Sequence, residues 1–288
     1  MRLARAAYNR ARMVDVLPRW ARLYGTSVGL GARYLVRHGY LREAVIRLIV
    51  PMDPIRYLEL PWARSVLDAS PGERVLDIGS PKLLAVALAD GGAEVTSIDL
   101  YEPEISRWRK LATGREHLRF EVADARELPF PDRCFDHAYS VSVIEHIDTD
   151  DGDGVVLAEM ARCVRPGGRI VLTLPFAPTA YDEYRPDALY GTQRQDERGF
   201  FFQRHYDWER VAALVAGEPR LRTRAFEIAG LRPDIATLYE RTFPLLVPLG
   251  PLFGLLAWRR RKGGTIARVV LERVEREPDV VTARAATT

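Results

Sequence analysis

Cysteine is nearly absent from this sequence. The 288 residues include only Cys134 and Cys163, which excludes a small fold held by several disulfides and is typical of a reducing compartment. The first residues also lack the uninterrupted apolar stretch of a secretory signal, because Arg10, Arg12 and Asp15 break it. We therefore expect a cytoplasmic protein.

A large net charge is missing as well, but the charge is unevenly distributed. The whole chain carries a formal +3. Residues 1–50 contain ten arginines against Asp15 and Glu43, so this segment carries +8 and the remaining residues carry −5. A basic arm on a mildly acidic body favours an anionic partner such as a lipid surface. It disfavours a domain that binds nucleic acid throughout.

The sequence has no apolar run of membrane-spanning length in its most apolar region, residues 243–258. These sixteen uncharged residues contain three prolines, and a regular spanning helix needs about 20 apolar residues. Trp258 and the four cations of residues 259–262 are typical of a segment that rests in a membrane interface. The alternatives are a cap on the core, a subunit interface or a pocket wall.

The first seventy residues have the pattern of a basic α-helical extension. Apolar residues at helical spacing, with arginines between them, predict helices over 3–24, kinked at Pro18, and over 32–50. Asp53 and Pro54 have the chemistry of an N-cap and a first helical residue, so a third helix is expected to end near residue 69.

From residue 74 onward, short β-type runs alternate with helical stretches, which predicts an α/β fold with a parallel sheet and helices on both faces. The predicted strands are 74–78, 94–99, 117–122, 136–141, 169–174, 221–228 and 265–274. The predicted helices are 82–90, 104–111, 155–164 and one capped by Asp207 that ends near 216. We expect one domain over 71–277 with an apolar insertion at 229–264, and a disordered tail at 278–288.

The ends of the first two predicted strands have the pattern of a nucleoside site. Gly79 follows the first strand, and Asp99 closes the second strand twenty residues later. Ligands of a doubly wound sheet bind at the carboxyl ends of its strands, where an acidic residue accepts hydrogen bonds from ribose hydroxyls. Either residue alone would more often serve a turn or a cap. Only Gly79 of the G-x-G-x-x-G motif is present, which disfavours a dinucleotide.

Five motifs follow one another in a characteristic order. They are Val75-Leu76-Asp77-Ile78-Gly79; Ile98-Asp99; Val122-Ala123-Asp124-Ala125 before Leu128-Pro129-Phe130; Phe135-Asp136 leading to Ile144-Glu145-His146-Ile147; and Arg165-Pro166-Gly167-Gly168. In these motifs the chain, over about residues 72–176, resembles the class I S-adenosylmethionine-dependent methyltransferases, in particular those with a type 11 domain. The resemblance implies a Rossmann-like seven-stranded methyltransferase sheet and S-adenosyl-L-methionine as the cofactor.

The resemblance also implies positions for the cofactor. Asp77 and Gly79 would lie beside its methionine part, and Asp99 on its ribose. Its adenine would meet Asp124 with Ala125. The backbone of Ser140 and Val141 would contact its amino group.

The loop after Gly79 departs from the family's pattern. Two further glycines usually follow at alternate positions, whereas this chain continues Ser80-Pro81-Lys82-Leu83-Leu84. We expect Ser80 to act as an N-cap and Pro81 as the first helical residue, with Ser80 and Lys82 both part of the cofactor site. Lys82 either pairs with the cofactor's carboxylate or is a solvated charge; the sequence favours neither.

Two histidines are candidates for a catalytic base, because a hydroxyl acceptor must lose a proton during methyl transfer. His146 follows the fourth predicted strand, and His205 lies in the aromatic segment 176–206. His146 could equally be structural. The aromatic segment could form a lid over the acceptor, although Phe200, Phe201 and Tyr206 could instead be core residues.

These patterns predict methyl transfer to a small-molecule or lipid-linked acceptor, with oxygen as the favoured acceptor atom. The acidic residues 148–154 fail as a calcium loop, because Asp153 stands where the sixth position needs glycine; we expect no metal. One alternative is a non-catalytic binding or scaffold protein with the same fold. The other is a nucleic-acid methyltransferase, which only the basic arm supports.

Overall fold

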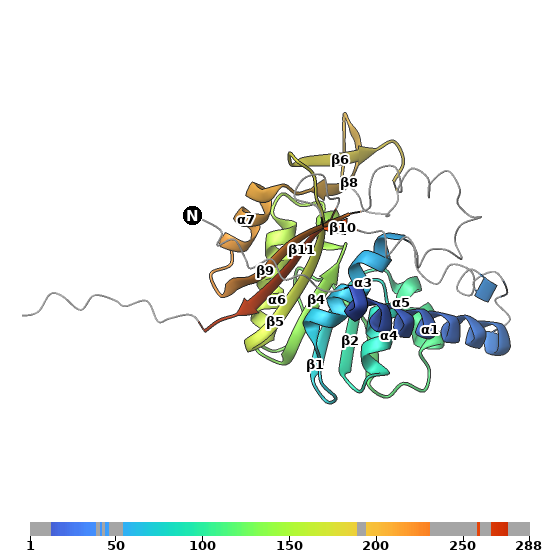
Figure 1. The fold of residues 1–288 in the computed structure, drawn as a ribbon. Helices are drawn as coiled ribbons and strands as arrows, with labels where there is room; N and C mark the ends of the chain where they lie inside the picture. Colours follow the sequence, from blue (N-terminus) through green and yellow to red (C-terminus); the bar gives the residue numbers. More distant parts are fainter. Residues whose placement is uncertain are drawn as a thin grey trace, which may run out of the picture.

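The computed structural model describes residues 13–38, 41, 44–45, 54–188, 194–230, 258–259 and 266–275. Its centre is a mixed sheet with the strand order β10-β9-β11-β5-β4-β1-β2-β3 (Figure 1). The strands are β1 (Arg74–Ile78), β2 (Glu94–Asp99), β3 (Leu118–Val122), β4 (Phe135–Val141), β5 (Val164–Pro175), β9 (Leu221–Gly230), β10 (Trp258–Arg259) and β11 (Ile266–Arg273). All seven strands expected from the sequence are present, and the two-residue edge strand β10 is additional.

The sheet is not parallel throughout. Strands β3, β2, β1, β4 and β5 pair in parallel, whereas β11 runs antiparallel between β5 and β9. The expectation of a parallel sheet is therefore wrong for β11. Strand periodicity shows which residues are buried, but it does not show the direction in which a strand joins its neighbours.

Side chains of the central strands point alternately to the two faces of the sheet, and this produces two hydrophobic cores. Val75 of β1 packs in one hydrophobic cluster, whereas Leu76 and Ile78 pack in the other. Strand β5 follows the same rule, with Val171 on the first side and Ile170 on the second. Because successive side chains point to opposite faces, both faces of the sheet need a layer of helices.

The helices form these two layers. The first face is covered by α1 (Met13–His38), α3 (Pro54–Leu67), α4 (Leu83–Ala89) and α5 (Glu102–Leu111), and the second by α6 (Gly152–Cys163) and α7 (Trp208–Ala216) (Figure 1). Leu30 of α1 and Leu67 of α3 belong to the same cluster as Val75. The helical extension thus shares the core of the domain. Asp207 caps α7 as expected, accepting a hydrogen bond from the Arg210 backbone N–H.

The helix boundaries near the start differ from the expectation. Helix α1 runs unbroken through Gly25, Gly29 and Gly31, where the sequence predicted a gap between two helices. A Cβ atom at Gly25 or Gly29 would meet nothing within 4 Å, so these glycines mark neither a turn nor a close contact. The parts of the predicted helices at 3–12 and 46–50, the Asp53 cap, the apolar run 243–257 and the tail 278–288 lie outside the described residues. Among the helices that are described, none has the length and apolarity to cross a bilayer.

The aromatic segment forms a small second sheet. Its strands are β6 (Tyr181–Arg185), β7 (Gln195–Asp196) and β8 (Gly199–His205), in the order β6-β8-β7. They lie beyond the carboxyl end of β5, above the central sheet in Figure 1. Phe201 and Tyr206 are fully buried, so for these two residues the core interpretation is confirmed.

Candidate active site

Asp77 anchors the carboxyl end of β1. The sheet register places it beside Ser97 of β2, whose hydroxyl donates to Asp77 Oδ2 at 2.6 Å. The Ser80 backbone N–H donates to Oδ1 at 3.2 Å. The carboxyl is fully buried, and burial raises its pKa while neighbouring Lys82 opposes that rise. Asp77 therefore holds the start of the β1–α4 loop from within the protein.

Lys82 joins the ends of β1 and β2. Its Nζ lies 3.1 Å from the Ile98 carbonyl, 3.7 Å from Asp77 Oδ2 and 3.5 Å from Asp99 Oδ2. Lys82 is only 3% exposed, so the interpretation as a solvated charge is wrong. A cation between two carboxylates offsets the cost of burying Asp77. Its contact with the cofactor stays a prediction.

Ser80 does not cap a helix. Helix α4 begins at Leu83 after Lys82, and its N-cap has no side-chain hydrogen bond. The Ser80 hydroxyl instead accepts from the Val141 backbone N–H at 2.8 Å and donates to the Ile78 carbonyl at 3.2 Å. Ser140 also donates to Ile78, at 3.3 Å. The expected N-cap is wrong because Ser80 ties the end of β1 to the end of β4.

Gly79 occupies a position that only glycine fits. Its φ is +61°, in the left-handed region, and its N–H donates to the Ile98 carbonyl at 2.9 Å. A Cβ atom there would come within 2.7 Å of Val143 Cγ1. The end of β1 therefore carries no side chain at the point where the loops after β1 and β4 approach each other.

Asp99 and Asp124 lie at the ends of the next two strands. Asp99 Oδ1 accepts from the Tyr101 backbone N–H at 3.0 Å, and 24% of its side chain is exposed. Asp124 follows β3 and is paired with Arg126 at 2.7 Å; this hydrogen bonding lowers its pKa. Ala125 beside it packs partly buried against the core. The expected ribose and adenine positions thus lie at one edge of the sheet.

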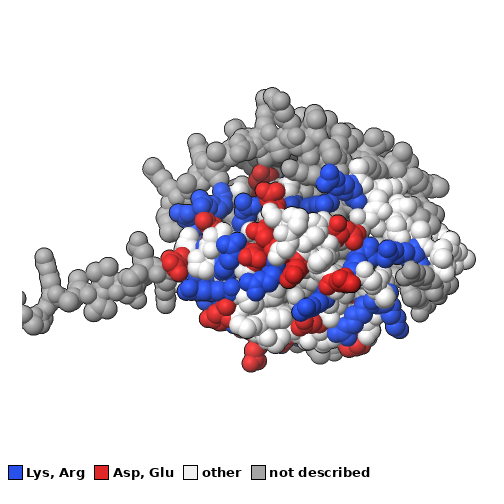
Figure 2. All heavy atoms as spheres, turned by 90° about the horizontal axis from the view of Figure 1, so that it is seen from below, with Lys and Arg blue, Asp and Glu red and all other residues white. Residues whose placement is uncertain are grey.

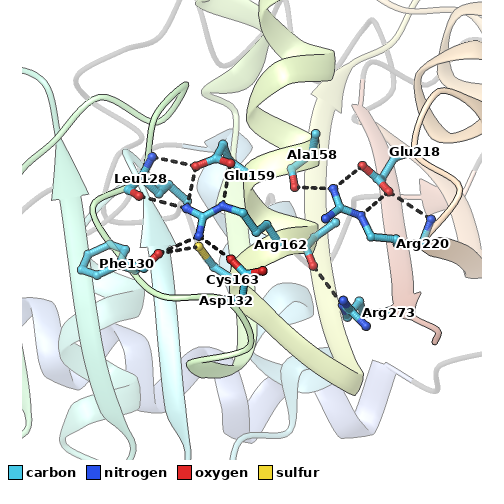
Figure 3. Close-up of polar contacts among 11 residues, drawn as sticks. Leu128, Phe130, Asp132, Ala158, Glu159, Arg162, Cys163, Glu218, Arg220 and Arg273 are labelled. Carbon is cyan, nitrogen blue, oxygen red and sulfur yellow. Dashed lines mark hydrogen bonds and ion pairs between the residues drawn. The ribbon is translucent and has the colours of Figure 1, made fainter. Parts of the chain in front are cut away.

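A clamp on α6 holds the loop that follows Asp124 and Ala125 (Figure 3). Arg162 donates to the carbonyls of Leu128 and Phe130 at 2.9 and 2.7 Å, and Glu159 accepts from the Leu128 backbone N–H at 2.8 Å. Sequence reasoning missed this clamp, because charged residues three apart on a helix are common and do not identify a distant partner.

The two candidate bases have different surroundings. His146 lies in η1 (Ile144–His146), directly after β4, and its Nδ1 is 2.7 Å from the Phe202 carbonyl. A carbonyl only accepts, so Nδ1 carries the hydrogen and Nε2 carries the lone pair. Burial lowers the pKa of His146, which keeps the imidazole neutral. His205 stacks on Tyr181 and has Nε2 2.9 Å from Glu183 Oε2, within the small sheet.

Two buried acids near the end of β4, Glu59 and Glu145, were not predicted. Glu59 of α3 accepts from the Ser142 hydroxyl at 2.5 Å and from the Thr173 hydroxyl at 2.7 Å. Ser142 has a φ of +52°, rare for a residue other than glycine. The signal available was a single acid within the apolar stretch Tyr57-Leu58-Glu59-Leu60-Pro61-Trp62.

Glu145 has fewer hydrogen bonds than Glu59. It is fully buried, and among the described residues neither of its oxygens has a hydrogen-bond partner. Burial, with a further contribution from the negative charge of Glu59, raises its pKa to about 8. At neutral pH its carboxyl is therefore protonated.

The opposite edge of the sheet has a different character. A hollow of about 270 Å³ there is lined by residues at the amino ends of strands, such as Arg74, Glu94 and Cys134, and includes none of the predicted site residues. Figure 2 shows basic and acidic side chains intermixed on the face seen from below. In the parts of the chain that the structure describes, no group of three or more His, Cys, Asp or Glu could hold a metal ion.

Comparison with known proteins identifies this arrangement. A family model described as a methyltransferase domain matches residues 76–172. A demethylmenaquinone methyltransferase of Mycobacterium marinum is 30% identical over 212 residues, which are 71% of this chain and 77% of that protein. The chain belongs to the class I S-adenosylmethionine-dependent methyltransferases.

Other similarities are shorter or concern the fold alone. A demethylmenaquinone methyltransferase of Beutenbergia cavernae is 36% identical over 138 residues, 45% of this chain. The chain thus spans about half of that relative, namely 52% of its length. The solved complex between the Haloferax volcanii Trm112 methyltransferase activator and the putative methyltransferase has 19% identity and a TM-score of 0.54, covering 77% of this chain and 91% of that chain. It supports the methyltransferase fold.

The donor set of this methyltransferase fits S-adenosylmethionine. Ribose hydroxyls need an acceptor at the end of β2, where Asp99 has a partly exposed carboxylate. Gly79 has a positive φ and no space for a Cβ, so the turn at the end of β1 requires glycine. At the methionine end, Lys82 lies in the loop that departs from the family's glycine pattern, and its charge is held by Asp77 and Asp99.

Proposed function

We propose that this protein transfers a methyl group from S-adenosylmethionine to a small-molecule or lipid-linked acceptor. The observation that carries the proposal is the set of groups at the carboxyl ends of β1 and β2, namely Gly79, Lys82 and Asp99. The names of its relatives support it, because those of Mycobacterium marinum and Beutenbergia cavernae are both demethylmenaquinone methyltransferases.

When bound, S-adenosylmethionine supplies a methyl group attached to its sulfonium sulfur, and the acceptor atom takes this methyl group in a displacement reaction. The protein would bind the cofactor and the acceptor, align them, and remove a proton from the acceptor. Asp99 would hold the ribose, while the loop of Asp124 and Ala125, fixed by Arg162, would form the adenine wall.

We further propose that His146 is the base and that the acceptor atom is oxygen. His146 is a neutral imidazole with its lone pair on Nε2, and 21% of its side chain is exposed. A hydroxyl acceptor loses its proton during methyl transfer, and such a base can accept that proton. His205, held by Glu183 within the small sheet, is the alternative base.

The test uses isotope-labelled S-adenosylmethionine and a short-chain demethylmenaquinol, which offers both hydroxyl and ring-carbon positions. The labelled methyl group is expected on oxygen, and NMR of the product distinguishes the two positions. His146→Asn should lower the rate by about 10²-fold or more, whereas the matched His205→Asn should change it little. Calorimetry with S-adenosylmethionine should show binding to both variants. Absence of cofactor binding to the intact protein would favour the non-catalytic alternative.

We also propose that the protein acts in the cytoplasm, at the surface of an anionic membrane. Four exposed apolar side chains gather at the end of α1 and just beyond it: Leu35, Val36, Leu41 and Val45. Arg33, also exposed, lies on the same last turns of α1. Apolar side chains flanked by cations combine hydrophobic and electrostatic attraction to anionic lipid.

A further inference from the structure

The segment that leads from His146 into α6 is held by the small sheet. Phe202 and Arg204 of β8, and Tyr206 just beyond it, are spaced two residues apart along an extended chain. The Phe202 carbonyl lies 2.7 Å from His146 Nδ1, and the centroids of the two rings are 5.0 Å apart. The Tyr206 hydroxyl donates to Asp153, in the first turn of α6, at 2.6 Å. One strand therefore contacts this segment at both of its ends.

Arg204 makes the contact between these two ends. It is only 2% exposed, and its guanidinium donates to the carbonyls of Ile147 and Thr149, the first and third residues after His146. Burying a guanidinium is costly unless acceptors satisfy its donors. Because these donors form a planar, rigid fork, two bonds to one short loop fix both the distance and the orientation of that loop relative to β8.

The loop that Arg204 holds is compact. The Thr149 carbonyl also accepts from the Gly152 backbone N–H at 3.1 Å. A Cβ atom at Gly152 would come within 2.2 Å of Ile147 Cγ2, so the two ends of the turn are in close contact. Since Ile147 is bonded directly to His146, a shift of this turn away from β8 would carry the imidazole with it.

We propose that Arg204 is a positioning residue for methyl transfer: it fixes the loop after η1 and thereby keeps His146 Nδ1 on the Phe202 carbonyl and the lone pair on Nε2. This inference rests on the proposed role of His146 as the base. The hydrogen bond of one ring nitrogen determines the state of the other. In the reaction, the acceptor's O–H bond breaks, its proton passes to Nε2 and later leaves to solvent, and Arg204 keeps its charge throughout.

The first measurement is the tautomer of His146, from the NMR shifts of its ring nitrogens in the full chain without cofactor. The chain has five histidines, and the spectrum of His146→Asn assigns the signal. The neutral ring of the wild type should carry its hydrogen on Nδ1, whereas Arg204→Met should give a mixture of tautomers. Arg210→Met is the matched control, because Arg210 of α7 pairs with Asp182 of β6 at 2.8 Å instead. It should keep the wild-type tautomer.

The second measurement is kcat with the short-chain demethylmenaquinol. Arg204→Met should lower kcat by about tenfold or more, because a small displacement of a catalytic group is costly. In a His146→Asn background the same substitution should cause no further loss, since it acts through the ring that is already missing. The Kd for S-adenosylmethionine should stay unchanged. Losses that multiply would show a general structural effect and overturn the proposal.

Two NMR results would also overturn it: a wild-type hydrogen on Nε2, or an unchanged tautomer in folded Arg204→Met. If Arg204→Met does not fold, Arg204→Lys replaces it, because lysine keeps the charge but lacks the planar fork that holds both carbonyls. An unchanged tautomer in Arg204→Lys is then the contradicting result. A wild-type protein without methyl transfer would instead refute the proposed function, whereas the tautomer tests the role of Arg204 without turnover.

Discussion

At the scale of single residues, the position of Asp99 gives the most direct test of the cofactor site. Asp99→Ala removes the expected charge-assisted hydrogen bonds to the ribose, worth roughly 1.5–3 kcal/mol, so the Kd for S-adenosylmethionine should rise at least about tenfold. Asp90→Ala is the matched control, because Asp90 pairs with Arg115 instead, at 2.7 Å. Calorimetry gives both values. If Asp99→Ala and Asp90→Ala bind S-adenosylmethionine with equal affinity, Asp99 is not part of the cofactor site.

Glu145 should make stability depend on pH in an unusual direction. Its folded-state pKa is about 8 against an ordinary 4.5, so its carboxyl favours the folded state while protonated. As pH rises from 4.5 to 8, the unfolded chain ionises first and the folded state loses stability, by an amount on the order of 4 kcal/mol. Glu145→Gln should therefore gain in unfolding free energy relative to the wild type as pH rises through this window. A difference that is constant with pH would contradict the buried, protonated state.

At the scale of elements, the clamp from α6 links helix packing to the adenine wall. Arg162→Met keeps the length of the side chain but removes its donors to Leu128 and Phe130. We expect the free energy of unfolding to fall by about 1–3 kcal/mol and the Kd for S-adenosylmethionine to rise. Arg220→Met is the control: Arg220 binds Glu218 and the Ala158 carbonyl, away from this loop (Figure 3). Arg220→Met should lower stability without changing the Kd. If both variants change the Kd equally, the Arg162 clamp has no specific effect on cofactor binding.

The elements also show how far sequence reasoning extends. Strands and helices were predictable from 74 to 175 because alternation and helical spacing are local signals. The direction of β11 and the pairing of β6 with β8 depend on partners far along the chain, which periodicity does not encode. The same reason hid the state of Glu145, since its carboxyl is unusual because segments from distant parts of the chain bury it. Ser80 was misassigned because its hydroxyl has a distant partner, Val141, that competes with capping.

At the scale of the whole molecule, the basic end of α1 should govern binding to lipid. Val36 is 83% and Leu41 62% exposed, and each cation near an anionic surface adds on the order of 1 kcal/mol. Replacing Arg33 and Arg37 with glutamine should weaken binding to phosphatidylglycerol-containing vesicles by about tenfold or more. Arg119→Gln, at an exposed residue of β3, is the control. Flotation measures binding, and equal flotation on neutral vesicles would contradict the electrostatic contribution.

The placement of Glu59 has a consequence for modularity. Helix α3 precedes the region that the methyltransferase family model covers, yet it supplies a carboxylate to the ends of β4 and β5 and apolar side chains to the core. Trimming the chain to residues 71–277 would strip the hydroxyls of Ser142 and Thr173 of their shared acceptor and would uncover one face of the sheet. The minimal folding unit of this protein is therefore longer than the region that the family model matches, and a transfer of that region to another protein would have to include α3.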